Sequence, residues 1–335
     1  MNRTQQVTVI IPNYNYEKTL PKCFEALSRQ TYKDFEIIFV DDGSTDNSVE
    51  IAKRYPCKII KTAKNEGVSA ARNLGAKNAV GEFLFFLDSD VALFDNAIEN
   101  TIKEFKRDST LGSVCGIYAK EPLFKGGLVK EYRTLQGHYW RISSVGYVTA
   151  GFFSLGAVKK SVFEELDGFK TNLNNSEDIE FGHRLNQKYR LLLTDKVVGY
   201  HDDEDKFKTL ARKMHHRAVQ RIPFYFHRKK LTKGFETPLR GLGMLAVGLS
   251  NLLIPLSFFS LYFLALFFCC VLGFILTDFG QYVFVCREKG FLFTLFFISA
   301  HWLITAIAFW GFVRGFISLI FSSKFRKKYM YEVNQ

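Results

Sequence analysis

Two aspartates that could hold a divalent cation, Asp88 and Asp90, directly follow an apolar run at 83–87. A run of this length predicts a strand buried on both faces of a sheet. Ligands of open α/β sheets gather at the carboxyl ends of strands, and two carboxylates there repel each other unless a cation lies between them. Hard oxygen ligands suit Mg²⁺ or Mn²⁺, ions that commonly hold substrate phosphates. An acidic turn after a strand is the alternative interpretation.

Two more polar groups suited to a nucleotide diphosphate occur at comparable positions. Asp42 follows a predicted strand at 35–40, and its carboxylate could accept a hydrogen bond from a base N–H. Arg72 lies near the start of a predicted helix and could face phosphate. A turn former and a solvated helix residue are the alternatives, but the agreement in position favours a nucleotide site. No glycine-rich dinucleotide fingerprint and no P-loop lysine motif is present, which disfavours both of those classes.

Alternating strands and helices must position these side chains. The pattern predicts a doubly wound, mostly parallel α/β sheet with right-handed crossovers. The expected strands are 7–11, 35–40, 57–61 and 83–87, and the expected helices are 17–29, one capped by Ser44 or Thr45, and 67–76. The segment 120–140 looks less regular. Strands at 147–155 and 197–201 and helices at 158–166 and after Ser176 are expected to follow.

The second half of the sheet region has an acidic pair at a helix start and a histidine at a strand end. Glu177 and Asp178 fall in the first turn of the helix after Ser176, where acidic residues are also common for electrostatic reasons alone. His201 ends a predicted strand and precedes the acidic run 202–205. By position alone, His201 fits an exposed turn residue.

Four motifs resemble family 2 glycosyltransferases of the GT-A fold, in the family's order and spacing. They are VIIPNYN at 9–15, DDGSTD at 41–46, NEGVSAARN at 65–73 and LDSD at 87–90. With the later segments, the resemblance covers about the first 230 residues. It implies an inverting transfer from a nucleotide-activated sugar with a divalent metal, Mn²⁺ or Mg²⁺.

The resemblance also implies roles for individual residues. Asp178 is the expected general base, because an inverting transfer needs one carboxylate to take the proton of the acceptor hydroxyl. Glu177 would orient the acceptor or Asp178. The remaining implied residues divide into nucleotide-sugar contacts at Pro12, Tyr14, Asp42, Arg72 and Asp88, and metal ligands at Asp90, Asp88 and His201.

Charge and cysteine content bear on the surroundings of the protein. The net charge of +12 fits either nucleic acid or an anionic membrane surface. Apolar residues at helical spacing from Phe207 to Ile222, with cations on the other faces, predict a basic amphipathic helix on a membrane. Nucleic acid is not expected as a partner, because the basic cluster 228–233 leads directly into membrane-like sequence. The six cysteines lack metal-binding spacing and predict free thiols.

The C-terminal part is expected to cross a membrane. The uncharged stretch 242–276 fits two tightly turned spans broken near 255–257, and 291–312 fits another after a polar connector at 278–290. Basic flanks on both sides favour the cytoplasm, which requires an even number of crossings and conflicts with three spans. A buried helical bundle is the alternative.

The sequence therefore predicts four regions. A catalytic domain occupies 1–205, with a nucleotide-sugar half at about 1–95 and an acceptor half at about 96–205. A basic membrane-proximal segment (206–240), a transmembrane region of two to three spans (241–320) and a basic tail (321–335) follow. The expected enzyme is multi-pass in a bacterial plasma membrane, faces the cytoplasm, and adds single sugars to a lipid-linked or glycan acceptor. A processive polysaccharide synthase and an inactive nucleotide-sugar-binding scaffold are the alternatives.

Overall fold

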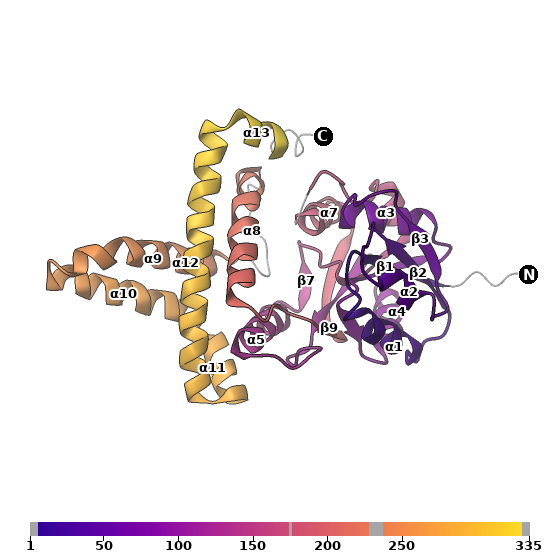
Figure 1. Ribbon diagram of the computed structural model, residues 1–335, viewed down its shortest axis with the longest axis horizontal. Helices are drawn as coiled ribbons and strands as arrows, with labels where there is room; N and C mark the ends of the chain where they lie inside the picture. The colour runs from indigo at the N-terminus through magenta and orange to yellow at the C-terminus, as the bar shows by residue number, and fades with distance from the viewer. Residues whose placement is uncertain (1–5, 174–175, 228–236, 330–335) are drawn as a thin grey trace, which may run out of the picture. The chain divides into compact units, whose positions relative to one another are not determined.

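The computed structural model describes residues 6–173, 176–227 and 237–329 (Figure 1). The predicted basic cluster at 228–233, the asparagines at 174–175 and the last residues of the tail lie outside this range. The chain forms two units. The first contains residues up to Lys125 and Trp140–Asp203, and the second contains Gly126–Tyr139 and everything from Glu204 onward. The segment 126–139, which the sequence placed in the acceptor half, thus groups with the C-terminal helices.

The first unit is built on one mixed sheet. Its strand order is β3-β2-β1-β4-β8-β6-β9-β5, with β7 paired to β9. The strands are β1 (Val7–Asn13), β2 (Phe35–Asp41), β3 (Lys58–Lys61), β4 (Phe83–Leu87), β5 (Val91–Leu93), β6 (Leu111–Tyr118), β7 (Gly146–Val148), β8 (Leu155–Lys159) and β9 (Arg190–His201). The expected α/β fold is confirmed, and parallel pairing is continuous from β3 to β4. Beyond β4 the sheet is mixed, because β8 runs antiparallel to both of its neighbours.

Helices cover both faces of this sheet, so its central strands are apolar on both sides. Val9 packs into the core that α1 (Leu20–Ser28) and α4 (Ala97–Arg107) share, together with α2 (Ser48–Ala52). Its neighbour Ile10 points to the opposite core, under α3 (Val68–Lys77), α6 (Lys160–Glu165) and α7 (Glu177–Leu185). This alternation is the period of two that a strand imposes on its side chains.

Local details differ from the sequence-based expectations. Ser44 and Thr45 do not cap α2, whose N-cap is Asn47. The hydroxyl of Ser44 instead accepts hydrogen bonds from Asn13 Nδ2 and from the backbone N–H of Asn15, which ties β1 to the loop after β2. Ser176 does occupy the N-cap of α7, but without a side-chain capping bond. The expected irregular segment contains a helix, α5 (Leu128–Ile142).

The second unit is helical. It contains α5 up to Tyr139, α8 (Phe207–His227), α9 (Pro238–Ser257), α10 (Leu261–Thr277), α11 (Phe279–Lys289), α12 (Phe291–Phe321) and α13 (Ser323–Tyr329). The predicted break near 255–257 is confirmed, since α9 ends at Ser257. The predicted polar connector is helical, because α11 occupies most of it.

Two helices of the second unit, α9 and α12, are long and apolar enough to cross a membrane. The pair α10 and α11 would make a third span only if its 72° bend lay within one span. The apolar stripe of α8, which was expected to lie on a membrane, packs against α12 through Leu210. The number of crossings and the side of the tail stay predictions.

Candidate active site

The aspartate pair after β4 lies in a turn that is fixed from three sides. Ser89 Oγ donates a 2.8 Å hydrogen bond to the carbonyl of Pro12, and the N–H of Asp88 donates a 3.0 Å bond to the carbonyl of Ser154. Val91, the first residue of β5, pairs with His201 at the end of β9. The turn therefore joins the carboxyl ends of β1, β4 and β9, where ligands of such sheets bind.

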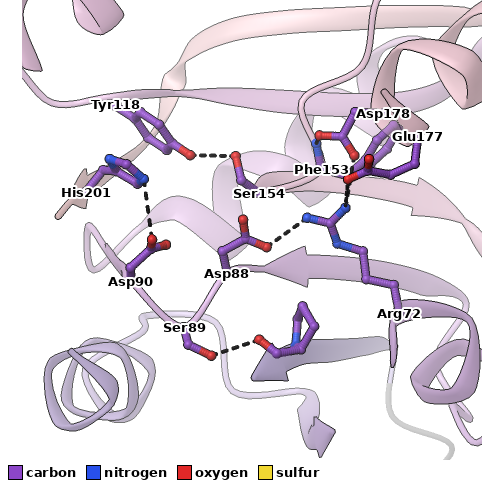
Figure 2. A network of polar contacts seen from close by, with 11 residues as sticks. Arg72, Asp88, Ser89, Asp90, Tyr118, Phe153, Ser154, Glu177, Asp178 and His201 are labelled. Carbon is purple, nitrogen blue, oxygen red and sulfur yellow. Dashed lines mark hydrogen bonds and ion pairs between the residues drawn. The ribbon is translucent and has the colours of Figure 1, made fainter. Parts of the chain in front are cut away.

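The strand pairing brings Asp90 and His201 together, as Figure 2 shows. His201 Nε2 lies 3.6 Å from Asp90 Oδ2, and its Nδ1 lies 3.1 Å from Asp203 Oδ1. The imidazole stacks on the ring of Tyr118 at a centroid distance of 4.3 Å. The contact of Asp203 with Nδ1 is an ion-pair distance, and a carboxylate on that side of the ring favours the tautomer that carries its proton on Nδ1 and leaves the lone pair on Nε2.

The two aspartates of the pair contact different residues. Asp88 Oδ1 accepts a 2.8 Å bond from Arg72 Nη2, and in Figure 2 its carboxylate faces Arg72 while that of Asp90 faces His201. The predicted metal set of Asp88, Asp90 and His201 is therefore only partly assembled. The described residues contain no preformed group of three or more metal-binding side chains.

Asp90 and His201 nevertheless fit a Mn²⁺ or Mg²⁺ site. Such ions are commonly held by one or two carboxylates together with substrate phosphates and water, so two protein ligands suffice. An imidazole beside a carboxylate suits Mn²⁺ better, since Mg²⁺ prefers oxygen. Both side chains are largely shielded, with 14% and 15% of their surface exposed.

Arg72 is the centre of the second half of the site. It is only 2% exposed and comes from the first turns of α3. Its Nη1 lies 3.0 Å from Asp178 Oδ1 and 3.4 Å from Glu177 Oε1, so one guanidinium joins the turn after β4 to the start of α7. A bidentate fork of fixed geometry is the reason that arginine suits such a position.

Asp178 is held by a second bond and has a perturbed pKa. The N–H of Phe153 donates a 3.1 Å hydrogen bond to Asp178 Oδ2. Burial raises the pKa of Asp178 to about 7, and the negative charges of Glu177 and Asp88 act in the same direction, whereas Arg72 opposes the rise. A carboxylic acid with a pKa near neutrality can both hold and release a proton at physiological pH.

The predicted nucleotide contacts away from this network hold local structure. Asp42 is buried and accepts hydrogen bonds from the N–H groups of Glu66 and Gly67, so it fixes the loop that leads into α3. Tyr14 is 45% exposed beside that strand edge. Their contacts with a nucleotide stay predictions.

The sequence reasoning missed four residues beside the site. Asp203 belongs to the acidic run after His201, a histidine for which an exposed turn was one of the two interpretations, yet Asp203 is buried. The hydroxyls of Tyr118 and Ser154 lie 2.5 Å apart. Arg141 places its guanidinium 3.8 Å from the centre of the Tyr118 ring. Only Asp203 had a local signature, namely an acidic residue two positions after a histidine at a strand end.

The comparisons identify the class of protein. Residues 8–147 match the family model described as glycosyl transferase family 2. The structure superposes on the mannosyltransferase PcManGT from Pyrobaculum calidifontis, solved with GDP-Man and Mn²⁺. The TM-score is 0.58 and the identity 16%, over 96% of this chain and 89% of that one. Residues 8–147 thus match a family 2 glycosyltransferase domain, and the fold is that of GT-A-type glycosyltransferases.

Two relatives from Streptococcus pneumoniae serotype 4 agree with this assignment. The glycosyltransferase GlyA is 37% identical over 126 residues, which are 36% of this chain and 18% of GlyA. The glycosyltransferase GlyG is 28% identical over 220 residues, which are 60% of this chain and 69% of GlyG. The chain thus matches less than a fifth of the length of GlyA.

Proposed function

We propose that the protein is a metal-dependent, inverting transferase that moves one sugar from a nucleotide-sugar donor to an acceptor hydroxyl. The observation that carries this proposal is the position of Arg72 between Asp88 and Asp178. A single buried cation links the turn that would face the donor diphosphate to the carboxylate that would take the acceptor proton. The distance between these two functions is then set by one rigid side chain.

Asp178 is the proposed general base. It would accept the proton of the acceptor hydroxyl while that oxygen attacks the anomeric carbon and the bond to the diphosphate breaks, so that the diphosphate leaves as an anion. The raised pKa of Asp178 makes it a stronger base than an ordinary aspartate. Glu177, 7% exposed next to it, would help to orient Asp178 through their shared contact with Arg72.

Asp90 and His201 are the proposed metal ligands, with Asp203 orienting the imidazole. A bound Mn²⁺ or Mg²⁺ would neutralise the charge that develops on the diphosphate, so no protein acid is needed to protonate the leaving group. Asp88 would contact the ribose or complete the metal site. PcManGT, a protein of the same fold, was solved with GDP-Man and Mn²⁺, which supports this type of donor and metal.

Pro12, Tyr14 and Asp42 are the proposed donor contacts at the neighbouring strand ends. The Pro12 carbonyl is already bonded to Ser89, so the first strand and the metal turn would respond together to a bound nucleotide. A free lone pair remains on Asp42 Oδ2, which accepts one hydrogen bond.

The proposed acceptor is a lipid-linked or glycan hydroxyl at the cytoplasmic face of a bacterial plasma membrane. The apolar helices of the second unit support a location beside lipid. In such a place the enzyme would contribute single sugars to a cell-envelope polysaccharide or related glycan.

The test is nucleotide release from a panel of nucleotide sugars by the detergent-purified full chain. It compares Mn²⁺ with a chelator, and membrane lipid extract with no extract. Release from one donor that needs metal and rises with lipid is expected for the unchanged protein. Asp178→Asn should lose about 10²- to 10⁴-fold of the lipid-stimulated rate, the usual contribution of a general base.

Asp195→Asn is the matched control, because this exposed aspartate of the first unit takes no part in the site. It should keep the full rate. No release from any donor by the folded protein would favour the scaffold alternative, and an unaltered rate in Asp178→Asn would refute the assignment of the base.

A further inference from the structure

The long apolar helix α12 packs closely against the charged helix α8. A Cβ added to Gly311 of α12 would lie 2.7 Å from the carbonyl oxygen of His215, and one added to Gly315 would lie 2.7 Å from that of Val219. The two glycines, four residues apart, therefore allow the backbones of α8 and α12 to approach closely. Because residue numbers rise together along both helices, α8 and α12 run in the same direction.

Helix α8 is rich in cations, of which Lys208 and Arg212 are exposed. The described cations of α8 from its start to Ile222 are Lys208, Arg212, Lys213, Arg217 and Arg221. Nearer its N-terminus, α12 is flanked by α5, where Tyr132 packs on Phe297 and Glu131 pairs with Lys289 at 3.1 Å. Polar helices thus accompany α12 from its first turns to Gly315.

The opposite side of α12 is an exposed apolar stripe. Its members recur at helical spacing and range from 45% to 81% exposed: Leu292, Leu295, Leu303, Trp310, Ile317 and Phe321. Arg314 is the charged residue on this side, and its long side chain can extend to lipid headgroups. The helix pair is therefore two-sided, with cations on one face and apolar side chains on the other.

An apolar hairpin projects from the same side as that stripe. In Figure 1, α8 lies on one side of α12, and α9 and α10 extend away from the other side. The base of the hairpin packs on α12 through Val247, Phe274 and Ala306. Its tip is bare, with Phe258 84% and Phe259 85% exposed.

The charges of the hairpin lie only at its base. Arg240 Nε pairs with Asp278 Oδ1 at 3.2 Å, and no charged residue occurs between them in the sequence. Because Val247 and Phe274 already pack on α12, only residues 248–273 extend beyond it, and at 1.5 Å per residue the two helical arms of this part are about 15–20 Å long. A hydrocarbon layer is about 30 Å thick, so the hairpin can enter the layer without crossing it. Its charged end lies at α12.

Two orientations in a membrane are conceivable for this unit. If α12 crossed the bilayer, α8 would carry its arginines and lysines through the hydrocarbon core, where they are among the most costly residues to place. The hairpin would then lie flat at mid-depth. If α12 lies along the surface, the cations of α8 meet headgroups, the stripe meets acyl chains and the hairpin enters the lipid.

We infer that the second unit attaches to the membrane from one side: α8 and α12 lie along an anionic leaflet, and only the α9–α10 hairpin enters the hydrocarbon. This inference builds on the membrane attachment proposed above and is independent of the reaction. It removes the conflict over an odd number of spans, because no helix crosses the bilayer. All helix ends remain on one face of the membrane, apart from the two that meet at the hairpin tip. The basic helix α13 then faces the same headgroups.

Cysteine accessibility in sealed membranes tests the inference with the full chain. Cys286, exposed on α11, reports the start of α12, Ser323→Cys reports its end and Phe259→Cys reports the hairpin tip. Each reporter is made in a background with Cys57, Cys269 and Cys270 replaced by serine, and with Cys286→Ser where Cys286 is not the reporter. An impermeant maleimide is added to intact cells or to inside-out vesicles.

Both ends of α12 should react in inside-out vesicles and not in intact cells. The tip should be at least tenfold less reactive than the ends from either side, and should react fully after detergent is added. Reaction of the two ends from opposite faces, or of the tip from the outer face, would overturn the inference. So would release of the protein from the membrane by alkaline carbonate. Nucleotide release by the same variants reports the proposed function separately: the three reporter positions lie in the second unit, and the background that carries Cys57→Ser gives the reference rate.

Discussion

The sheet core of the first unit and the hairpin tip of the second unit place their phenylalanines in opposite ways. In the first unit, Phe153, Phe169 and Phe181 pack edge to face beneath the site and are almost fully buried. In the second, Phe258 and Phe259 project from the hairpin with more than four-fifths of their surface exposed. Since burial of apolar surface is the main stabilising term in water, the sheet core excludes water, whereas the hairpin tip exposes an apolar surface. Phenylalanine thus has a different role in these two regions.

The sharpest test of this contrast removes one ring from each unit. Phe181→Ala leaves a cavity in a packed core and should lower the free energy of unfolding by about 3–5 kcal/mol. Phe258→Ala removes a ring that touches little and should change it by less than about 0.5 kcal/mol. Urea unfolding in detergent measures both. A similar loss in the two variants would contradict the contrast.

A large effect is also expected from the buried cation of the first unit. Arg72→Met leaves Asp88, Glu177 and Asp178 as neighbouring carboxylates without a counter-charge, which should cost about 3 kcal/mol of stability at pH 8. The cost should shrink toward pH 5. A group whose pKa is raised in the folded state loses stability as pH rises through that pKa, and without Arg72 the pKa of Asp178 rises further.

Arg29→Met is the control for that experiment, because its side chain is 55% exposed and its partner Asp95 is 58% exposed, so the pair lies at the surface. It should change the stability by less than about 0.5 kcal/mol at either pH. Equal destabilisation by Arg72→Met at pH 5 and pH 8 would argue against charge repulsion as the cause.

The pH dependence of the reaction follows from the raised pKa of Asp178. Only the ionised form can take the acceptor proton, so kcat/KM should be half-maximal near pH 7. It should be about a hundredfold below its plateau at pH 5, since each pH unit below the pKa removes a factor of about ten. Initial rates from pH 5 to 9 at saturating Mn²⁺ measure this. A flat profile down to pH 5 would exclude Asp178 as a base of this pKa.

A smaller effect is expected from replacing Asp203, whose carboxylate lies beside Nδ1 of His201. Asp203→Asn leaves His201 in place but weakens the control of its tautomer, so the Mn²⁺ concentration for half-maximal activity should rise about 10- to 100-fold. The rate at saturating metal should remain largely intact. Asp195→Asn again serves as control. A lower maximal rate with unchanged metal requirement would assign Asp203 a structural role only.

The sequence predicted those features that depend on local pattern. The apolar run before Asp88, the strand ends at Asp42 and His201 and the break after Ser257 all follow from periodicity and turn residues over a few positions. These positions indicated a nucleotide-sugar site at one edge of the sheet, and the strand pairing does bring Asp90 and His201 together.

What the sequence could not predict depends on distant contacts. Arg72 was expected at the nucleotide, but its partner Asp178 lies 106 positions further along the chain, and no local pattern specifies that pairing. Ser44 was expected to cap a helix, although its hydroxyl is engaged by Asn13 from another strand. In the same way, the apolar stripe of α8 was expected to lie on a membrane surface. The stripe packs on α12, which comes about 90 residues later, and no local pattern indicates that contact.

The uncharged hairpin also bears on how the protein is made. From Gly241 to Thr277 there is no charge, and the ends of this stretch are joined by the pair of Arg240 and Asp278. In the one-sided attachment inferred above, no charged segment has to be moved across a bilayer. The hairpin can enter the lipid after the ribosome has released the chain, with the ion pair left in the headgroup region. Biogenesis would then need no translocation of a hydrophilic loop, and removal of the hairpin would yield a protein that remains on the cytoplasmic side.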